Sequence, residues 1–130
     1  MAYDLMDDVK PLITAAITGV TVAGELTMDT ENMIAILHTG GMNPIHTFGA
    51  QKAVIIQPSF QIVIRHLSEN TMHGWWDKIK IALDGKTNYT VNARTYLSIF
   101  QQGDVLDLGR DDARRHIQVL NFNAQVTDAY

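Results

Sequence analysis

The side chains in this sequence that could do chemistry are its histidines and a run of acids and arginines near the C-terminus. The histidines are His38, His46, His66, His73 and His116. No two of them lie four residues apart, the spacing that puts two imidazoles on one face of a helix, and the motif HExxH is absent. We therefore expect no metal site among them.

The charged run lies between residues 103 and 116. Its members are Asp104, Asp107, Arg110, Asp111, Asp112, Arg114 and Arg115. The acids do not follow the spacing of a calcium-binding loop, and three arginines share the segment with them. We interpret the run as a solvated turn whose charges neutralise one another, rather than as a cation site.

Motifs for covalent and phosphate chemistry are also absent. The sequence contains no GxSxG, no GxxxxGK[ST] and no GxGxxG. It has no cysteine, which removes disulfides, thiol catalysis and cysteine-bound zinc together. One alternative is a ligand or enzyme site at residues 38–44, where His38 stands beside two glycines. A histidine bonded to backbone at a strand end is commoner, so we predict no catalytic residue and no cofactor.

Composition indicates an ordinary globular protein. We expect one domain over residues 1–130, long enough to bury about two-thirds of the surface that the unfolded chain exposes. The net charge of −4 and the scattered Lys and Arg argue against a surface that grips phosphates, although they are compatible with a passage for DNA. Apolar runs are too short to cross a bilayer, and the acidic N-terminus, MAYDLMDD, is unlike a signal peptide.

The elements that must position these side chains begin with a helix over residues 3–17, whose apolar residues follow the 3.6 period. Pro11 interrupts this pattern. Either the helix kinks there, or its well-formed part begins at Asp7 or Asp8 with Pro11 in the first turn. Gly19 is expected to end the helix.

Three strands are predicted next, over residues 21–26, 33–38 and 53–67. Residues 39–44 contain two glycines and Asn-Pro, so we expect an irregular loop there. Pro58 should keep the start of the third strand out of a central ladder.

A second helix is predicted from a cap at Ser68 or Asn70 to an end at Asp84 and Gly85. Its inner stripe consists of Met72, Trp76, Ile79 and Leu83. Trp75 is rotated from that stripe by about 100°, and it either roofs the edge of the core or contacts another chain.

A polar link over residues 86–92 leads into a long hairpin over residues 96–126. In its last strand the apolar phase changes near Val119 and Leu120, which indicates either a bulge or a strand that is apolar on both faces. A strand of the second kind would need a neighbouring subunit, because two helices cover only one face of a sheet. The order of elements predicts an α+β fold: a mixed, mostly antiparallel β-sheet with two helices packed on one face and a long C-terminal β-hairpin.

Several segments in this order resemble the minor capsid or tail terminator proteins of long-tailed bacteriophages, over nearly the whole chain. They are the acidic N-terminal helix, IAILHTGGMNPIHTFG (34–49), PSFQIVIRHL (58–67) and GDVLDLGRDDARRH (103–116) leading into VLNFNAQV. The resemblance implies a structural protein without catalytic residues. It also implies a six-membered ring that caps the tail tube, ends tail elongation and joins the tail to a head completion or connector protein, with DNA passing through the lumen without sequence-specific binding.

The resemblance places the protein in the virion, at the junction of head and tail, after synthesis in the cytoplasm of the host bacterium. Since ring subunits carry two different patches, charges of both signs can fix which patch meets which. From charge we assign the subunit interface to the seven charged residues of the run at 103–116. The alternatives are a hairpin solvated in a monomer, another virion protein of the tail tube or head completion kind, and the small enzyme or ligand-binding module at residues 38–44.

Overall fold

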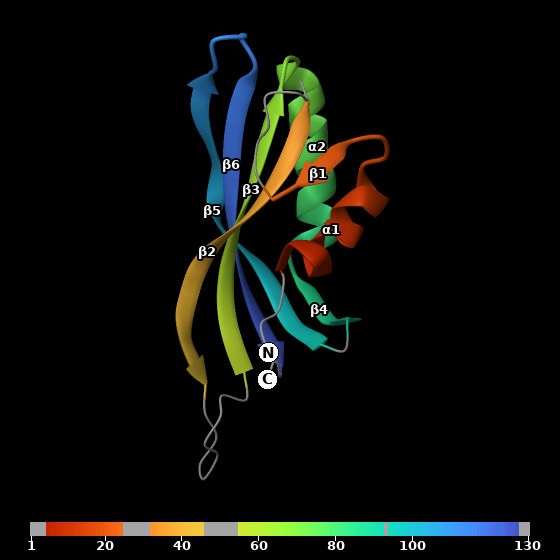
Figure 1. Ribbon diagram of the computed structural model, residues 1–130, viewed down its shortest axis with the longest axis vertical. Coiled ribbons are helices and arrows are strands. Elements are labelled where there is room, and N and C mark those ends of the chain that lie inside the picture. The colour runs from red at the N-terminus through yellow and green to blue at the C-terminus, as the bar shows by residue number, and fades with distance from the viewer. Residues whose placement is uncertain (1–4, 25–31, 46–54, 93, 128–130) are drawn as a thin grey trace.

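The computed structural model describes residues 5–24, 32–45, 55–92 and 94–127. These residues form two layers, a six-stranded sheet and two helices that cover one of its faces (Figure 1). In chain order the elements are α1 (Leu5–Ala16), β1 (Thr21–Ala23), β2 (Met33–Ile45), β3 (Ile55–His66), α2 (Glu69–Leu83), β4 (Lys86–Val91), β5 (Arg94–Arg110) and β6 (His116–Thr127). The strand order is β1-β2-β3-β6-β5-β4. β1 runs parallel to β2 and the other four neighbouring pairs are antiparallel, which confirms the predicted α+β fold with its C-terminal hairpin, β5–β6.

α1 begins at Leu5 and holds Pro11 in its interior, so the late start at Asp7 or Asp8 is wrong. Residues 3 and 4 lie outside the described residues. α1 buries Val9 and Ile13 against the core, and Ile17, the residue directly after the helix, is buried with them. Burying each contributes about 1.5–3 kcal/mol, which together exceeds the roughly 3 kcal/mol that an interior proline costs a helix.

The structure confirms the predicted boundaries of α2 and its predicted stripe of buried residues. Ser68 is the N-cap, and its hydroxyl accepts a hydrogen bond of 3.3 Å from the backbone N–H of Thr71. The buried residues are Met72, Trp76, Ile79 and Leu83. Trp75 is half-buried at the edge of the core, with its ring centroid 4.6 Å from that of His66. Gly19 after α1 and Gly85 after α2 both have φ of +75°, the left-handed conformation that ends a helix.

The prediction of an irregular loop at residues 39–44 is wrong. β2 continues through this segment to Ile45 and stays paired with β3, with register shifts on both sides of the glycine pair. Gly40 and Gly41 have φ of +97° and +147°, and a Cβ on Gly41 would lie 2.1 Å from the carbonyl oxygen of Gln57. The glycines therefore allow a bulged strand to approach its neighbour closely, and they do not interrupt it.

β3 is a central strand between β2 and β6 even though it contains Pro58. Its ladder with β6 is interrupted there. Ile56 pairs with Val126, and the next paired residues are Ser59 and Asn123. The interruption follows from the missing N–H of proline.

Two further segments differ from the prediction. The polar link at residues 86–92 is mostly the edge strand β4. β5 extends to Arg110, so three members of the charged run lie in a strand, and the turn itself, with the other four, is confined to residues 111–115. Register shifts between β5 and β6 accompany Gly103 and Gly109, whose φ values are +74° and +92°.

β6 is apolar on both faces where Val119 and Leu120 follow one another. It pairs with β3 in one register through Val119 and Leu120, so these two buried residues point to opposite sides of the sheet. Leu120 belongs to the main core beneath the helices. Val119 belongs to a smaller cluster with Ala35 and Val63 on the other side. The alternative of a bulge in β6 at this point is therefore wrong, and the extra residues lie in β5, between Gln102 and Leu106.

Candidate functional site

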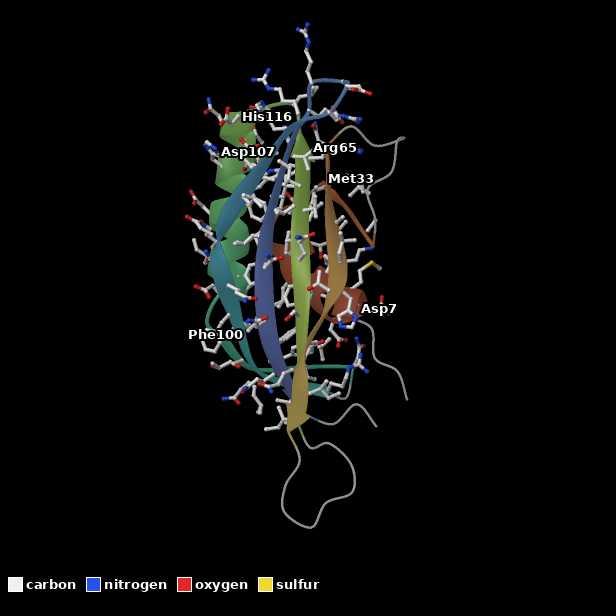
Figure 2. The ribbon with its side chains drawn as sticks, turned by 90° about the vertical axis from the view of Figure 1, so that its left-hand side faces the viewer. Asp7, Met33, Arg65, Phe100, Asp107 and His116 are labelled. Carbon is white, nitrogen blue, oxygen red and sulfur yellow. The ribbon has the colours of Figure 1, made fainter. Side chains whose placement is uncertain are left out.

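The sheet face away from the helices carries no covering element in the described part of the chain, and we call it the open face (Figure 2). Strand pairing arranges its side chains in rows across β5, β6, β3 and β2. The row at its apolar end consists of Leu106, Val119, Val63 and Ala35. Ile117 and Leu37 pack beside this row, and Leu106 is 59% exposed. This end of the open face is therefore an apolar surface that water reaches at the β5 edge.

The remaining rows of the open face are mostly polar where β3 pairs with β6. The hydrogen bonds that join β3 to β6 there run from Ser59 Oγ to Asn123 Oδ1 (2.6 Å), from Gln61 Nε2 to Asn121 Oδ1 (3.2 Å) and from Gln125 Nε2 to Gln57 Oε1 (3.1 Å). Arg65, which is 4% exposed, is the charged residue among the described members of these rows. The described side chains of the open face are therefore amides, hydroxyls and apolar groups, and none of them is an exposed charge that could hold a phosphate.

A hollow of about 220 Å³ lies within the amide rows. It is lined by Gln57, Ser98, Phe100, Asn123, Ala124 and Gln125. Phe100 is 52% exposed at this place. The hollow is larger than a cavity of ~150 Å³ that binds benzene, so it has room for an aliphatic side chain.

Two of the seven predicted interface residues, Asp111 and Arg115, hold the hairpin turn together. Asp111 Oδ1 accepts hydrogen bonds from the backbone N–H groups of Ala113 (3.0 Å) and Arg115 (2.9 Å), and Oδ2 accepts from Arg115 Nε (2.8 Å). Burial alone would raise the pKa of Asp111, but these bonds and the charge of Arg115 lower it below its ordinary value. Arg115 is 8% exposed, so it is part of the turn's own structure.

Asp104 and Asp107 also have partners within the chain. Asp104 Oδ1 accepts from the backbone N–H of Val105 (2.7 Å) and lies 3.4 Å from Lys80 Nζ on α2. The hydrogen bond from Val105 and the contact with Lys80 lower the pKa of Asp104. Asp107 Oδ1 accepts from the backbone N–H of Gly109 (2.8 Å).

Arg110, Asp112 and Arg114 are the remaining three of the seven. Their side chains are exposed, and none of them forms an ion pair with another described residue. The structure therefore does not bring the seven charges together at one point. It places these three where another chain can reach them.

The most extensive polar contact of the described chain centres on Asp8, which was not among the predicted site residues. Its carboxylate is fully buried on α1 and accepts hydrogen bonds from Arg94 Nε (2.9 Å) and Nη2 (2.7 Å), Tyr96 Oη (2.5 Å) and Asn92 Nδ2 (2.8 Å). Tyr89 Oη donates to the Asp8 carbonyl oxygen (2.9 Å). Burial alone would raise the pKa of Asp8, but the bonds from Arg94, Tyr96 and Asn92 and the charge of Arg94 lower it.

The Asp8 cluster fastens α1 to the β4–β5 hairpin and so fixes the helix layer on the sheet. A sequence signal for its burial exists, because Asp8 lies four residues before Leu12 and next to Val9, on the apolar side of the helix. Its partner Arg94 is 86 residues away, and no local pattern indicates that pairing.

Among the described residues, no group of three or more histidine, aspartate or glutamate side chains is placed to hold a metal ion. His38, the centre of the ligand site considered above, is exposed on β2 and not in a loop. His46 lies outside the described residues. Neither helix of the described chain has the length and apolar character that crossing a membrane requires.

The charged hairpin, by which we mean the end of the β5–β6 hairpin at residues 110–115, exposes Arg110, Asp112 and Arg114. A two-layer α+β domain with this hairpin and with no exposed charge among the described residues of its open face has the surfaces of a structural protein that contacts other protein chains. The sequence matches the family described as bacteriophage tail terminator protein over residues 3–128, and the chain belongs to that family. It is therefore a structural component of the phage tail, a family role that involves contacts with other virion proteins. A search of curated proteins found no match.

Proposed function

We propose that this protein forms a ring, a hexamer in its simplest form, that caps the end of the phage tail tube and stops its elongation. The ring then joins the tail to a head completion or connector protein, and DNA passes through its centre. The single observation that carries the proposal is membership of the tail terminator family along nearly the whole chain. The protein is made in the host cytoplasm and ends at the head–tail junction of the virion.

The charged hairpin supports a specific subunit contact. The bond between Asp111 and Arg115 gives the turn a defined conformation. The exposed side chains in and beside it are those of Arg110, Asp112 and Arg114. Charges at the rim of an interface contribute orientation and partner choice more than affinity. In the ring, these three side chains cross to the neighbouring subunit.

Passage of DNA requires a lumen that does not hold the duplex. Each phosphate neutralised by Lys or Arg adds affinity, which would slow the movement of DNA. The net charge of −4 and the scattered Lys and Arg supply few such contacts. These properties support a ring that surrounds DNA without binding its sequence.

Native mass measurement with electron microscopy of mixtures with tail tubes tests the proposal. We expect closed rings and tubes that carry the protein at one end only. Growth of the protein by itself into long tubes would instead identify a tail tube protein. A protein that stays monomeric at high concentration and leaves tube ends bare would contradict the proposal.

A charge reversal tests the hairpin contact separately. We expect Arg114→Glu to weaken the ring, whereas the matched reversal Lys10→Glu on α1 should leave its mass unchanged. Equal ring stability in both variants would remove the hairpin from the interface.

A further inference from the structure

The second half of β5 lies at an outer edge of the sheet. β4 pairs with β5 as far as Ile99, and the N–H of Gln101 donates to Asp84 Oδ1 (2.8 Å). Residues 102–110 continue to pair with β6 on their inner side, but no strand of the described chain pairs with their outer side. We call residues 102–110 the β5 outer edge. A strand edge of this kind presents main-chain donors and acceptors to which another strand can pair.

Side chains on the β5 outer edge differ between the two sides of the sheet. Leu106 belongs to the apolar row of the open face, and Leu108 shares that side because side chains alternate along a strand. They are 59% and 58% exposed. Asp107 lies on the helix side, since it pairs with Gln118, whose amide oxygen accepts from Trp76 Nε1 (2.9 Å). A strand that pairs here therefore meets leucines on one side and an acid on the other.

Two donors of the β5 outer edge are satisfied by side chains in the isolated subunit. The N–H of Val105 donates to Asp104 Oδ1 (2.7 Å), and the N–H of Gly109 donates to Asp107 Oδ1 (2.8 Å). The carbonyl oxygens of a neighbouring strand can accept from the same donors and release the two carboxylates. The edge is therefore stable in a lone subunit and is still able to take a strand.

β2 has a similar stretch at the opposite edge of the sheet. β1 pairs with its outer side at residues 33–35, and Pro44, which has no N–H, limits a ladder at the other end. No strand of the described chain pairs with the outer side of residues 36–43, which we call the β2 outer edge. Figure 2 shows Asp107 of β5 and Met33 of β2 along opposite edges of the sheet.

The two outer edges match in direction and in length. Three antiparallel steps lead from β2 to β5, so the two strands run in opposite directions. A second copy placed beside the first by rotation about an axis along the sheet therefore presents its β2 antiparallel to β5. Residues 102–109 of one copy can then lie opposite residues 43–36 of the next.

This alignment brings complementary side chains together on both sides of the sheet. On the open face Leu108 meets Leu37, which packs against the smaller apolar cluster of its own subunit. On the helix side Asp107 meets His38, which pairs with Phe60 of the main core and therefore shares its side of the sheet. Leucines opposite each other exclude water, and an imidazole N–H can donate to a carboxylate. A second copy of this chain is thus the partner that fits the β5 outer edge.

The stagger between the two copies also fits a closed ring. At Leu106 the subunit's own sheet carries Ala35, whereas the alignment places Thr39 of the neighbour at this level. This shift of about four residues is roughly 13 Å along the strand, against ~19 Å across the four strand spacings from one β2 to the next. Strands displaced in that ratio tilt by about 35° from the ring axis, and strands of closed barrels tilt by about 35–45°.

We propose that the β5 outer edge of one subunit pairs, antiparallel, with the β2 outer edge of the next copy of this chain, so that one sheet continues from subunit to subunit. Main-chain hydrogen bonds supply the affinity, and the pairs Leu108–Leu37 and Asp107–His38 set the register. Because two different edges meet, the contact is heterologous, and rotation repeats it around a ring. This inference rests on the proposed ring and names the strands that form it.

Cysteine cross-linking tests the pairing directly because the chain has no cysteine of its own. We expect a chain carrying both Leu37→Cys and Leu108→Cys to form, on oxidation, a ladder of covalent multimers that extends beyond dimers. Within one chain β3 and β6 separate these positions, which puts them beyond the Cα distance of about 4.4–6.8 Å that a disulfide spans. The control pair, Leu37→Cys with Thr90→Cys on β4, should give no ladder. Complete conversion of Leu108→Cys alone into dimers would show that β5 pairs with itself and would overturn the proposal.

A charge swap tests the register. His38→Asp should weaken ring assembly about tenfold or more, because it places a second carboxylate opposite Asp107, and the further change Asp107→Lys should restore assembly. Leu108→Lys should also weaken assembly, as a lysine on a strand edge opposes pairing. Ile81→Lys, at an exposed apolar residue of α2 away from both edges, is the control and should not. Equal assembly in all these variants would contradict the pairing.

Hydrogen exchange of the wild type separates this inference from the ring itself. We expect amides within residues 36–43 and 102–109 to exchange more slowly in the ring than in the dilute monomer. A ring in which these amides exchange as fast as in the monomer, and which gives no ladder, overturns the strand pairing and leaves the ring standing. A wild-type chain that remains monomeric with and without tail tubes overturns both.

Discussion

At the scale of single residues, Asp8 has the strongest structural role. Its carboxylate is fully buried and is bonded to Arg94, Tyr96 and Asn92. Removing one partner from a buried ion pair leaves the other charge unpaired, which costs about 3–5 kcal/mol. We expect Asp8→Asn to lower the free energy of unfolding by an amount of that order, measured by urea denaturation.

Asp7 provides the matched control for that substitution. It is the preceding residue of α1 and is exposed (Figure 2). Asp7→Asn should change the free energy of unfolding by less than about 0.5 kcal/mol, as surface substitutions usually do. Equal effects at the two positions would contradict the buried role of Asp8.

The buried ion pair between Asp8 and Arg94 also predicts how the stability of the folded chain depends on pH. The pKa of Asp8 is lower in the folded chain than its ordinary value of 3.8, so the unfolded state takes up the proton first as the pH falls. The stabilisation is therefore complete above the ordinary value and is lost as the pH falls toward and through the folded-state pKa. Thermal midpoints measured from neutral pH into this acid range should fall more steeply in the wild type than in Asp8→Asn. Parallel curves would show that other carboxylates control acid unfolding.

At this scale the sequence gives the type of each residue, but it does not indicate which residues bond to each other. The charged run at residues 103–116 is evident from the sequence, but its division into inward and outward members is not. Asp111 and Arg115 bond to each other while Arg114, between them, stays exposed at φ +64°. That difference depends on the conformation of the turn, for which the sequence has no periodic signal.

At the scale of elements, β2 shows that two adjacent glycines, which are typical of a turn, can lie within a strand. Gly41 approaches the backbone of Gln57 so closely that a Cβ would overlap its carbonyl oxygen, at 2.1 Å. We expect Gly41→Ala to reduce stability by about 1–3 kcal/mol, because the strand must move or adopt a strained conformation. Hydrogen exchange should rise in the amides of β2 and β3 that flank the bulge.

Gly74→Ala is the control for Gly41→Ala, since both add one methyl group to a glycine. Its Cβ meets no atom, so it should stabilise the chain by about 0.5–1 kcal/mol. If both variants were destabilised equally, the close approach of β2 to β3 would not explain the need for Gly41.

The helices were predictable because their signals are local. The N-cap at Ser68, the glycine stop at Gly85 and the apolar stripe of α2 all lie within a few turns. β4 was missed because an edge strand presents only part of one face to the core, and its half-buried residues Tyr89 and Val91 stand among polar neighbours. The rows of the open face depend on the register between β3 and β6, which are separated in sequence by α2, β4 and β5. Such register is set by the assembled sheet, and no local pattern records it.

At the scale of the whole molecule, one sheet separates two kinds of surface. The helices cover one face of the sheet (Figure 1), and the main core lies beneath them. The described residues of the open face carry no exposed charge, and they include apolar residues at one end. The charged hairpin extends from the same sheet. A ring built from these parts combines an apolar contact, which depends weakly on salt, with an ionic contact at its rim.

That combination predicts a partial response to salt. Screening lengths fall from about 10 Å at 0.1 M to about 3 Å at 1 M ionic strength, so salt should weaken the contribution of Arg110 and Arg114 to the proposed ring. We expect the dissociation constant of the wild-type ring, measured by sedimentation, to rise with salt, and that of an Arg110→Ala, Arg114→Ala variant to rise less. Loss of two interfacial cations must reduce the number of charges that salt can screen. If the dissociation constant of the double arginine variant rose with salt as steeply as that of the wild type, the ionic contact would lie elsewhere.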